Sequence, residues 1–175
     1  MPDQAVLDVL VRAMITEQDG YDFYMAAADF VKDEKGKEML SGLANDEIGH
    51  LHILQAEYGK VQGGRSFIDL DSARAEFPTD PKLRLFPEKS NLSSMLGAMT
   101  GDEQALRVAL EFEQKGYEMY QAAAQSAGDP NAAAVFAYLA KQENEHYVLI
   151  QQTLNYLVDN GMWFFQDGEM PIFEG

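Results

Sequence analysis

Residues 17–50 read EQDGYDFYMAAADFVKDEKGKEMLSGLANDEIGH, and residues 113–146 read EQKGYEMYQAAAQSAGDPNAAAVFAYLAKQENEH. The two stretches align without a gap at an offset of 96, and the alignment carried through residues 17–55 and 113–151 contains 14 identities in 39 positions. Each copy supplies one isolated Glu and one Glu-x-x-His, and carboxylates and imidazoles are common ligands of transition metals. The sequence therefore predicts a tandem pair of similar helical hairpins that carry the same ligand types.

Composition narrows the class of protein. A chain of 175 residues with 46% apolar content is long enough for one domain with a substantial core. The net charge of -16 argues against nucleic acid and against an anionic membrane as partners, and it favours cation binding. The absence of cysteine excludes disulfides, thiolate catalysis and Cys-bound metal centres. With no membrane-length apolar run and no signal-peptide pattern at the start, we expect a cytoplasmic protein.

Capping residues predict an all-α chain with four long helices. Asp33 is placed to cap the second helix, and Asp129 followed by Pro130 gives the fourth helix an N-cap and a proline at its first position. Thr100-Gly-Asp-Glu103 reads as a capping box that opens the third helix. The four helices are expected from about residue 3 to 31, from 34 to the glycines at 59–64, from 101 to 128, and from 130 to 159–161.

A segment of about residues 61–99 joins the two hairpins. It is too long for a tight turn and too apolar for a disordered linker, so we expect a crossover packed along the bundle, with short helices near 69–76 and 92–99. Residues 1–160 are thus expected to form one four-helix bundle. Residues 161–175 carry four aromatic side chains, and we expect this tail to pack on the bundle or on a partner subunit.

Spacing within each hairpin places the candidate ligands at one height. Glu17 lies 16 residues before the turn at Asp33, while Glu47 and His50 lie 14 and 17 residues after it. In antiparallel helices that rise about 1.5 Å per residue, the three side chains sit roughly 20–25 Å from the turn. The second hairpin repeats these spacings around Asp129 with Glu113, Glu143 and His146. Six ligands can therefore meet at mid-bundle.

A single Glu-x-x-His is weak evidence, because 15 Glu in 175 residues place a Glu three residues before a given His by chance about 9% of the time. Two of the three histidines show the motif in register with a duplicated Glu, which favours a metal site. His52 lacks the motif and is expected at the surface or at the core boundary. Four tyrosines are first of all core aromatics, and their hydroxyls are also candidates to hydrogen-bond the ligand carboxylates: Tyr21, Tyr24, Tyr117 and Tyr120.

At these residues the chain resembles the ferritin-like superfamily and, more closely, the rubrerythrin family of di-iron carboxylate proteins. The resemblance covers roughly residues 5–60 and 101–158, and it implies a ferritin-like bundle with two iron ions per chain, although the same donors suit manganese. It implies terminal ligands at Glu17 and Glu113, bridging carboxylates at Glu47 and Glu143, and one imidazole ligand per iron at His50 and His146.

Two departures from the family pattern bear on function. Typical rubrerythrins carry a rubredoxin domain with a four-cysteine iron, and this sequence has no cysteine. They also carry an additional Glu three residues after the third-helix ligand, where this chain has Gly116. Electrons are therefore expected from an external donor protein such as a rubredoxin.

The resemblance implies an oxidoreductase. This would be a peroxidase that acts in oxidative stress and reduces hydrogen peroxide, with dioxygen as the competing oxidant. The same ligands would also serve a ferroxidase or iron-binding protein, manganese-dependent catalase chemistry, or a helical bundle that binds metal without catalysis. Peroxide turnover with a donor would separate an enzyme from a binding protein. Ferritin-like relatives commonly dimerise, so a homodimer is expected.

Overall fold

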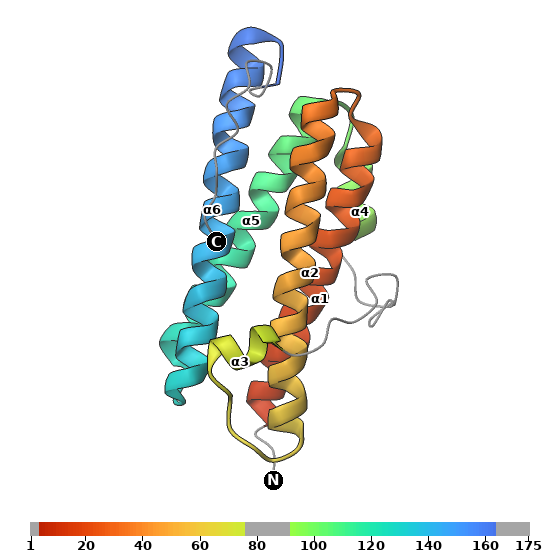
Figure 1. The fold of residues 1–175 in the computed structure, drawn as a ribbon. Helices are drawn as coiled ribbons and strands as arrows, with labels where there is room; N and C mark the ends of the chain where they lie inside the picture. The colour runs from red at the N-terminus through yellow and green to blue at the C-terminus, as the bar shows by residue number, and fades with distance from the viewer. Residues whose placement is uncertain (1–3, 76–91, 164–175) are drawn as a thin grey trace.

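The computed structural model describes residues 4–75 and 92–163, and within them the chain forms six helices and no strand. Four helices are long, α1 (Gln4–Phe30), α2 (Glu34–Gln62), α5 (Asp102–Ser126) and α6 (Pro130–Asn160), and two are short, α3 (Leu70–Ala75) and α4 (Leu92–Ala98). The predicted all-α four-helix bundle is confirmed (Figure 1). The middle of the predicted crossover and most of the predicted tail lie outside the described residues.

The bundle is built from two antiparallel hairpins, α1 with α2 and α5 with α6 (Figure 1). α5 begins at the end of the bundle where α2 begins, so α1 and α5 run in opposite directions, and so do α2 and α6. This arrangement relates the two hairpins by an approximate two-fold rotation, and it brings the middle of each helix to the middle of the bundle. None of the helices in the described ranges is both long and apolar enough to cross a membrane.

Local capping sets several of the helix ends. The Asp33 side chain accepts a hydrogen bond from the backbone N–H of Gly36, which caps α2 as predicted. Asp129 caps α6 by accepting from two backbone N–H groups of its first turn, with Pro130 at the first helical position. α6 ends at Gly161, whose φ of 67° is the left-handed conformation that glycine adopts without steric cost.

The predicted capping box at Thr100 is wrong. α5 begins after Gly101, which has no side chain to accept a hydrogen bond, and no side-chain cap is formed there. Asp102 and Glu103 instead lie in the first turn, where negative charge interacts favourably with the helix dipole. The short helices α3 and α4 fall where they were predicted.

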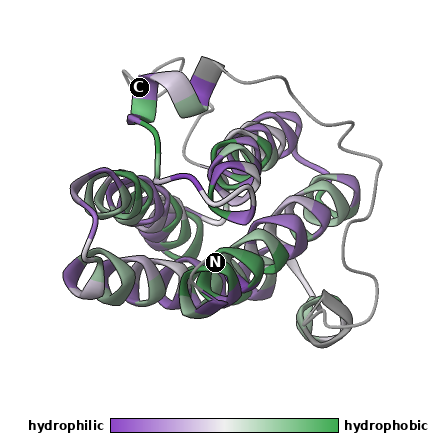
Figure 2. Ribbon diagram, turned by 90° about the horizontal axis from the view of Figure 1, so that it is seen from below, coloured by the Kyte–Doolittle hydropathy of each residue, from purple (hydrophilic) through white to green (hydrophobic). Residues whose placement is uncertain are grey.

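Two apolar clusters fill the bundle, one toward each end. The first includes Leu10, Leu54 and Phe136, and the second includes Phe23 and Leu106, all buried. Figure 2, which looks along the bundle, shows apolar and polar residues on different sides of the long helices. Between the two clusters lies a layer of buried charged residues, and this layer is the candidate functional site.

Trp163 joins the end of the described chain to the bundle. Its ring is 2% exposed and packs on Gly36, where a Cβ would lie only 2.8 Å from the ring carbon Cε2. Its indole N–H donates to Asp102 at 3.0 Å. The start of the predicted tail thus packs on its own bundle and holds the first turns of α2 and α5 together.

We expect Trp163→Ala to lower the free energy of unfolding by about 3–5 kcal/mol, because it removes a buried aromatic ring and leaves a cavity against Gly36. Urea-induced unfolding followed by circular dichroism measures the loss. Trp163→Phe should recover much of the stability, since it keeps a ring and loses the hydrogen bond to Asp102. Val158→Ala, at a residue that is 54% exposed, should change little. Equal stability of Trp163→Ala and the unmodified chain would contradict this packing role.

Candidate metal centre

Six buried side chains meet at mid-bundle between the two apolar clusters. α1 and α5 each contribute an isolated Glu, and α2 and α6 each contribute a Glu-x-x-His. All six are at most 6% exposed: Glu17, Glu47, His50, Glu113, Glu143 and His146. The structure therefore brings together every residue that the repeat predicted as a metal ligand.

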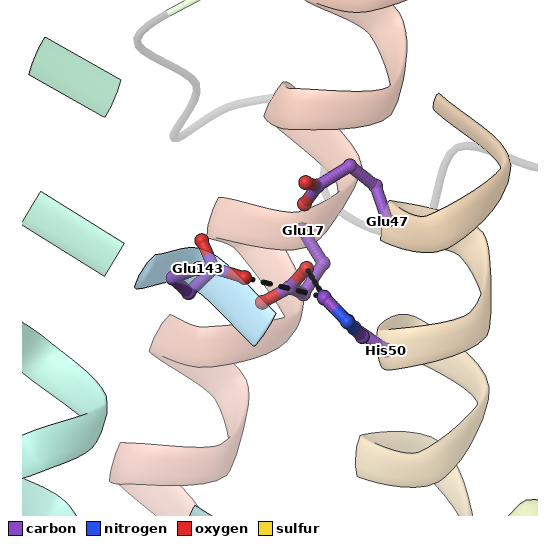
Figure 3. Close-up of side chains that lie close together, drawn as sticks. All are labelled: Glu17, Glu47, His50 and Glu143. Atoms are coloured by element: carbon purple, nitrogen blue, oxygen red, sulfur yellow. Dashed lines mark hydrogen bonds and ion pairs between the residues drawn. The ribbon is translucent and has the colours of Figure 1, made fainter. Parts of the chain in front are cut away.

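The six residues form two overlapping groups of four. In each group, one possible ligand atom per residue lies within 4.8 Å of the others. The group that we name the His50 position contains Glu17, Glu47, His50 and Glu143 (Figure 3), and the group that we name the His146 position contains Glu47, Glu113, Glu143 and His146. Glu47 and Glu143 belong to both groups, so their carboxylates lie between the two positions.

Each imidazole points the same ring nitrogen at carboxylates. His50 Nδ1 lies 3.2 Å from Glu17 Oε2 and 3.2 Å from Glu143 Oε1, as the dashed lines in Figure 3 show. His146 Nδ1 lies 3.4 and 3.5 Å from oxygens of the other two glutamates. The two rings stack with their centroids 5.7 Å apart. Both histidines are thus oriented to bind an ion through Nδ1.

Two tyrosines connect the hairpins at the centre. Tyr24 on α1 donates its hydroxyl hydrogen to Glu113 on α5, and Tyr120 on α5 donates to Glu17 on α1. Each tyrosine is fully buried, and each therefore orients the isolated carboxylate of the opposite hairpin. Sequence spacing proposed both tyrosines as candidates, but it could not show that the bonds cross between hairpins.

The other candidates lie away from the centre. Tyr21 and Tyr117 are half-buried, and the hydroxyl of Tyr117 accepts a hydrogen bond from Gln121 at 2.8 Å. His52 is also half-buried, in agreement with the expectation of a boundary histidine, and it belongs to neither group of four. Only two of the four predicted tyrosines therefore hydrogen-bond the candidate ligands.

Several atoms of the centre that could bind a metal have no hydrogen-bond partner within the described part of the chain. They are both carboxylate oxygens of Glu47 and of Glu143, Oε2 of Glu113 and Nδ1 of His146; three of these oxygens lie 3.2–3.5 Å from a histidine Nδ1, in ion-pair contacts that are not hydrogen bonds. Buried polar atoms are normally paired, because an unpaired buried polar group costs free energy. Metal cations would pair these atoms, so the residues fit a metal site.

The charges of the centre act differently on its glutamates. Burial, reinforced by the charges of Glu17 and Glu143, raises the pKa of Glu47 well above its ordinary value. Burial and the charges of Glu113 and Glu17 do the same to the pKa of Glu143. Burial also opposes ionisation of Glu17, but the adjacent His50 outweighs burial and lowers the Glu17 pKa. The two shared carboxylates are thus the ones that take up protons.

The charges of neighbouring glutamates keep both histidines protonated. Burial alone would lower the pKa of His50, but the charge of Glu17 raises it to about 9. Burial also opposes protonation of His146, and the charge of Glu113 raises its pKa well above the ordinary value. Without metal, the centre therefore balances its charge with protons. Metal binding must displace those protons.

Glycines on α1 and α5 allow the shared carboxylates to approach the helices. A Cβ on Gly116 would lie 2.4 Å from Glu143 Oε2, and a Cβ on Gly20 would lie 2.9 Å from Glu47 Oε2 and 2.7 Å from Phe112 Cζ. Any larger residue would therefore displace a group of the centre. Side chains of the bundle thus fill the space beside both glycines.

Asp46 is a contact of the centre that the sequence analysis did not identify. Its Oδ2 lies 3.3 Å from His146 Nε2, the ring nitrogen opposite the one that faces the carboxylates. A carboxylate at this place orients a metal-binding imidazole. The available signal was a second acidic residue immediately before Glu47, but its partner depends on how α2 packs against α6.

Two cavities lie near the centre, and one of them is lined by a residue of the centre. One of about 370 Å³ lies between α1, α4 and α5 and is lined by Thr16 and Phe112, the residues before the isolated glutamates. The other, of about 220 Å³, is lined by His50, Arg74 and Tyr138 on the α2–α6 side. The cavity on the α2–α6 side therefore reaches the imidazole of His50, and the other cavity is lined by none of the six candidate ligands.

Comparison with known proteins identifies the family. The family model described as Rubrerythrin matches residues 8–154, a range that includes all six candidate ligands and reaches into all four long helices. The chain belongs to the rubrerythrin family. Rubrerythrins are ferritin-like di-iron proteins, and the buried Glu and His cluster fits a dimetal protein of this kind.

One solved structure supports the fold of this family member. A hypothetical protein from Pyrococcus furiosus matches with a TM-score of 0.65 and 21% sequence identity, over 90% of this chain and 92% of that chain. At this identity the match shows the fold alone. The comparison with curated proteins found no match.

Proposed function

We propose that this protein is a di-iron oxidoreductase that reduces hydrogen peroxide to water with electrons from an external donor protein, such as a rubredoxin. The observation that carries the proposal is the pair of overlapping Glu and His groups that share Glu47 and Glu143. In this proposal Glu17 and His50 would hold one iron ion, Glu113 and His146 would hold the other, and Glu47 and Glu143 would be ligands shared by both.

Charge balance supports two divalent ions per chain. Four ionised glutamates carry four negative charges and two neutral histidines carry none, so two divalent cations would neutralise the buried centre. Mixed carboxylate and imidazole ligands suit iron and manganese, and membership of a di-iron family favours iron. Elemental analysis of protein purified without added metal distinguishes the two metals.

The residues of the chain hold and orient the reaction site. A bound iron pair would supply the two electrons that reduce the O–O bond, and two protons complete the conversion of one peroxide to two waters. Burial and the nearby glutamates raise the pKa of Tyr24 and of Tyr120 well above its ordinary value, so both hydroxyls remain protonated donors to the isolated carboxylates. The cavity that Thr16 and Phe112 line is large enough for a small oxidant.

Stopped-flow oxidation tests this function. We expect anaerobically reduced, iron-loaded protein to be oxidised faster by hydrogen peroxide than by dioxygen, and we expect sustained turnover to require added reduced rubredoxin. Tyr120→Phe should slow the reaction because Glu17 loses its hydrogen-bond donor. Tyr117→Phe is the matched control, since that hydroxyl bonds to Gln121 outside the centre.

The other outcomes select the alternative functions. Faster oxidation by dioxygen than by peroxide would overturn the peroxidase proposal in favour of a ferroxidase. Iron binding without oxidation by either oxidant would indicate a metal-binding bundle without this catalysis.

A further inference from the structure

The two halves of the metal centre differ at the outer nitrogen of their imidazoles. Asp46 on α2 lies 3.3 Å from Nε2 of His146, which belongs to the other hairpin. The offset of 96 makes Gln142 on α6 the counterpart of Asp46 and makes His50 the counterpart of His146. An exact repeat would therefore place a carboxylate beside His50 as well, and this chain places an amide there.

Gln142 is engaged with other groups. Its Nε2 donates to Glu145 at 2.8 Å, and its Oε1 accepts from the Tyr138 hydroxyl at 3.4 Å. Gln142 and His50 line the same small cavity, together with Arg74, whose guanidinium lies 5.1 Å from the centre of the Tyr138 ring. His50 thus borders a cavity that both Arg74 and Asp46 line, whereas Nε2 of His146 contacts the Asp46 carboxylate directly.

This difference changes how well each imidazole is prepared to bind a cation. When Nε2 of His146 carries the proton and donates it to Asp46, the lone pair of Nδ1 faces the carboxylates of the centre. The carboxylate of Asp46 also favours a cation bound by the imidazole that it contacts. Tyr24 and Tyr120 do not distinguish the two positions, because they serve the two isolated glutamates in the same way.

We propose that the two metal positions are unequal, with Asp46 as a positioning residue that makes the His146 position the tighter one and the first to fill. A chain with one ion would then hold it between Glu113, His146 and the two shared glutamates. This inference rests on the dimetal part of the proposed function and not on peroxide chemistry.

Titration of the metal-free protein with Co²⁺ tests the inference, with binding followed by calorimetry and visible absorption. Asp46→Asn should weaken the first binding step by about 10–100-fold while the total remains two ions per chain. Gln142→Asp should strengthen the second step, because it adds the missing carboxylate beside His50. Asp46 is a safe position to change, since its side chain is 59% exposed and lies outside the core.

Paramagnetic NMR shows which position fills first. With one equivalent of Co²⁺, the strongly shifted imidazole protons should belong to His146, and in Asp46→Asn they should divide between His146 and His50. The histidine variants His146→Gln and His50→Gln assign these signals. A purely structural role of Asp46 would not move the signals from one ring to the other.

Glu145→Gln is the matched control. It removes one negative charge from the same region, and Glu145 bonds to Gln142 and Lys141 rather than to an imidazole. An equal weakening of the first step in Glu145→Gln and Asp46→Asn would overturn the inference, because the effect would then be one of general charge. Two ions bound with no effect of Asp46→Asn would also overturn it, and would leave the dimetal proposal intact. Binding of no Co²⁺ by the unmodified chain would overturn both.

Discussion

A Glu47→Ala variant is expected to lose both metal ions of each chain. Glu47 belongs to both groups of four, and its two oxygens are buried without a hydrogen-bond partner in the described residues. Each position would keep at most three ligands, and the pair would lose one of its two bridges. Elemental analysis should give a metal content near zero where the unmodified chain gives about two ions.

Two matched variants show whether both ions are lost because Glu47 is shared between the two metal positions. Glu57→Gln changes another fully buried glutamate of α2 outside both groups, and it should leave two ions in place. Glu17→Ala changes a glutamate of the His50 position only, so it should affect that ion more than the other. A Glu47→Ala protein that still binds two ions would show that this carboxylate is not a bridge.

The second large effect concerns stability without metal. We expect Glu47→Gln to stabilise the metal-free protein by roughly 1–3 kcal/mol near neutral pH, because it removes a buried carboxylate whose ionisation is opposed by burial and by neighbouring glutamates. The same change should reduce the stabilisation by metal. In the unmodified chain, metal at about 1,000 times its Kd contributes roughly 4 kcal/mol, or about 8–16 °C in Tm for a chain of this size.

The direction in which stability changes with pH follows from the groups whose pKa is shifted. Glu47, Glu143, His50 and His146 have a pKa above the ordinary value, so the folded protein binds more protons than the unfolded chain. These four groups contribute their full stabilisation at pH values below their pKa in the unfolded chain. That stabilisation is lost as the pH rises to their pKa in the folded protein, which for His50 is the pH range from 6.5 to about 9. Glu17 acts in the opposite direction, because its lowered pKa gives stability that is lost as pH falls.

Thermal unfolding in a chelator, followed by circular dichroism, measures this dependence. The Tm of the metal-free chain should fall from about pH 6 to about pH 9, while the rise in Tm on adding metal should increase, because fewer protons must be displaced. Glu47→Gln should flatten both trends. A metal-free chain that becomes more stable over this pH range, or that Glu47→Gln destabilises, would contradict a centre of crowded carboxylates.

Features that depend on neighbouring residues were available from the sequence. Asp33, Asp129 and Gly161 mark helix ends because capping is a contact within one turn. The six candidate ligands meet at one height because each helical residue adds the same rise, so equal numbers of residues from the turn give equal distances along the bundle. The repeat shows the same spacing in both hairpins. The error at Thr100 was also local, since a one-residue change in where α5 begins replaces a side-chain cap with glycine.

Only the tertiary structure decided which groups of the two hairpins face each other. Tyr24 reaches Glu113 and Asp46 reaches His146 across 89 and 100 residues of sequence, and Trp163 reaches Asp102 across 61. These contacts depend on how far each helix is rotated and shifted against its neighbours. That rotation is set by the packing of many apolar side chains at once, and spacing along one helix does not contain it.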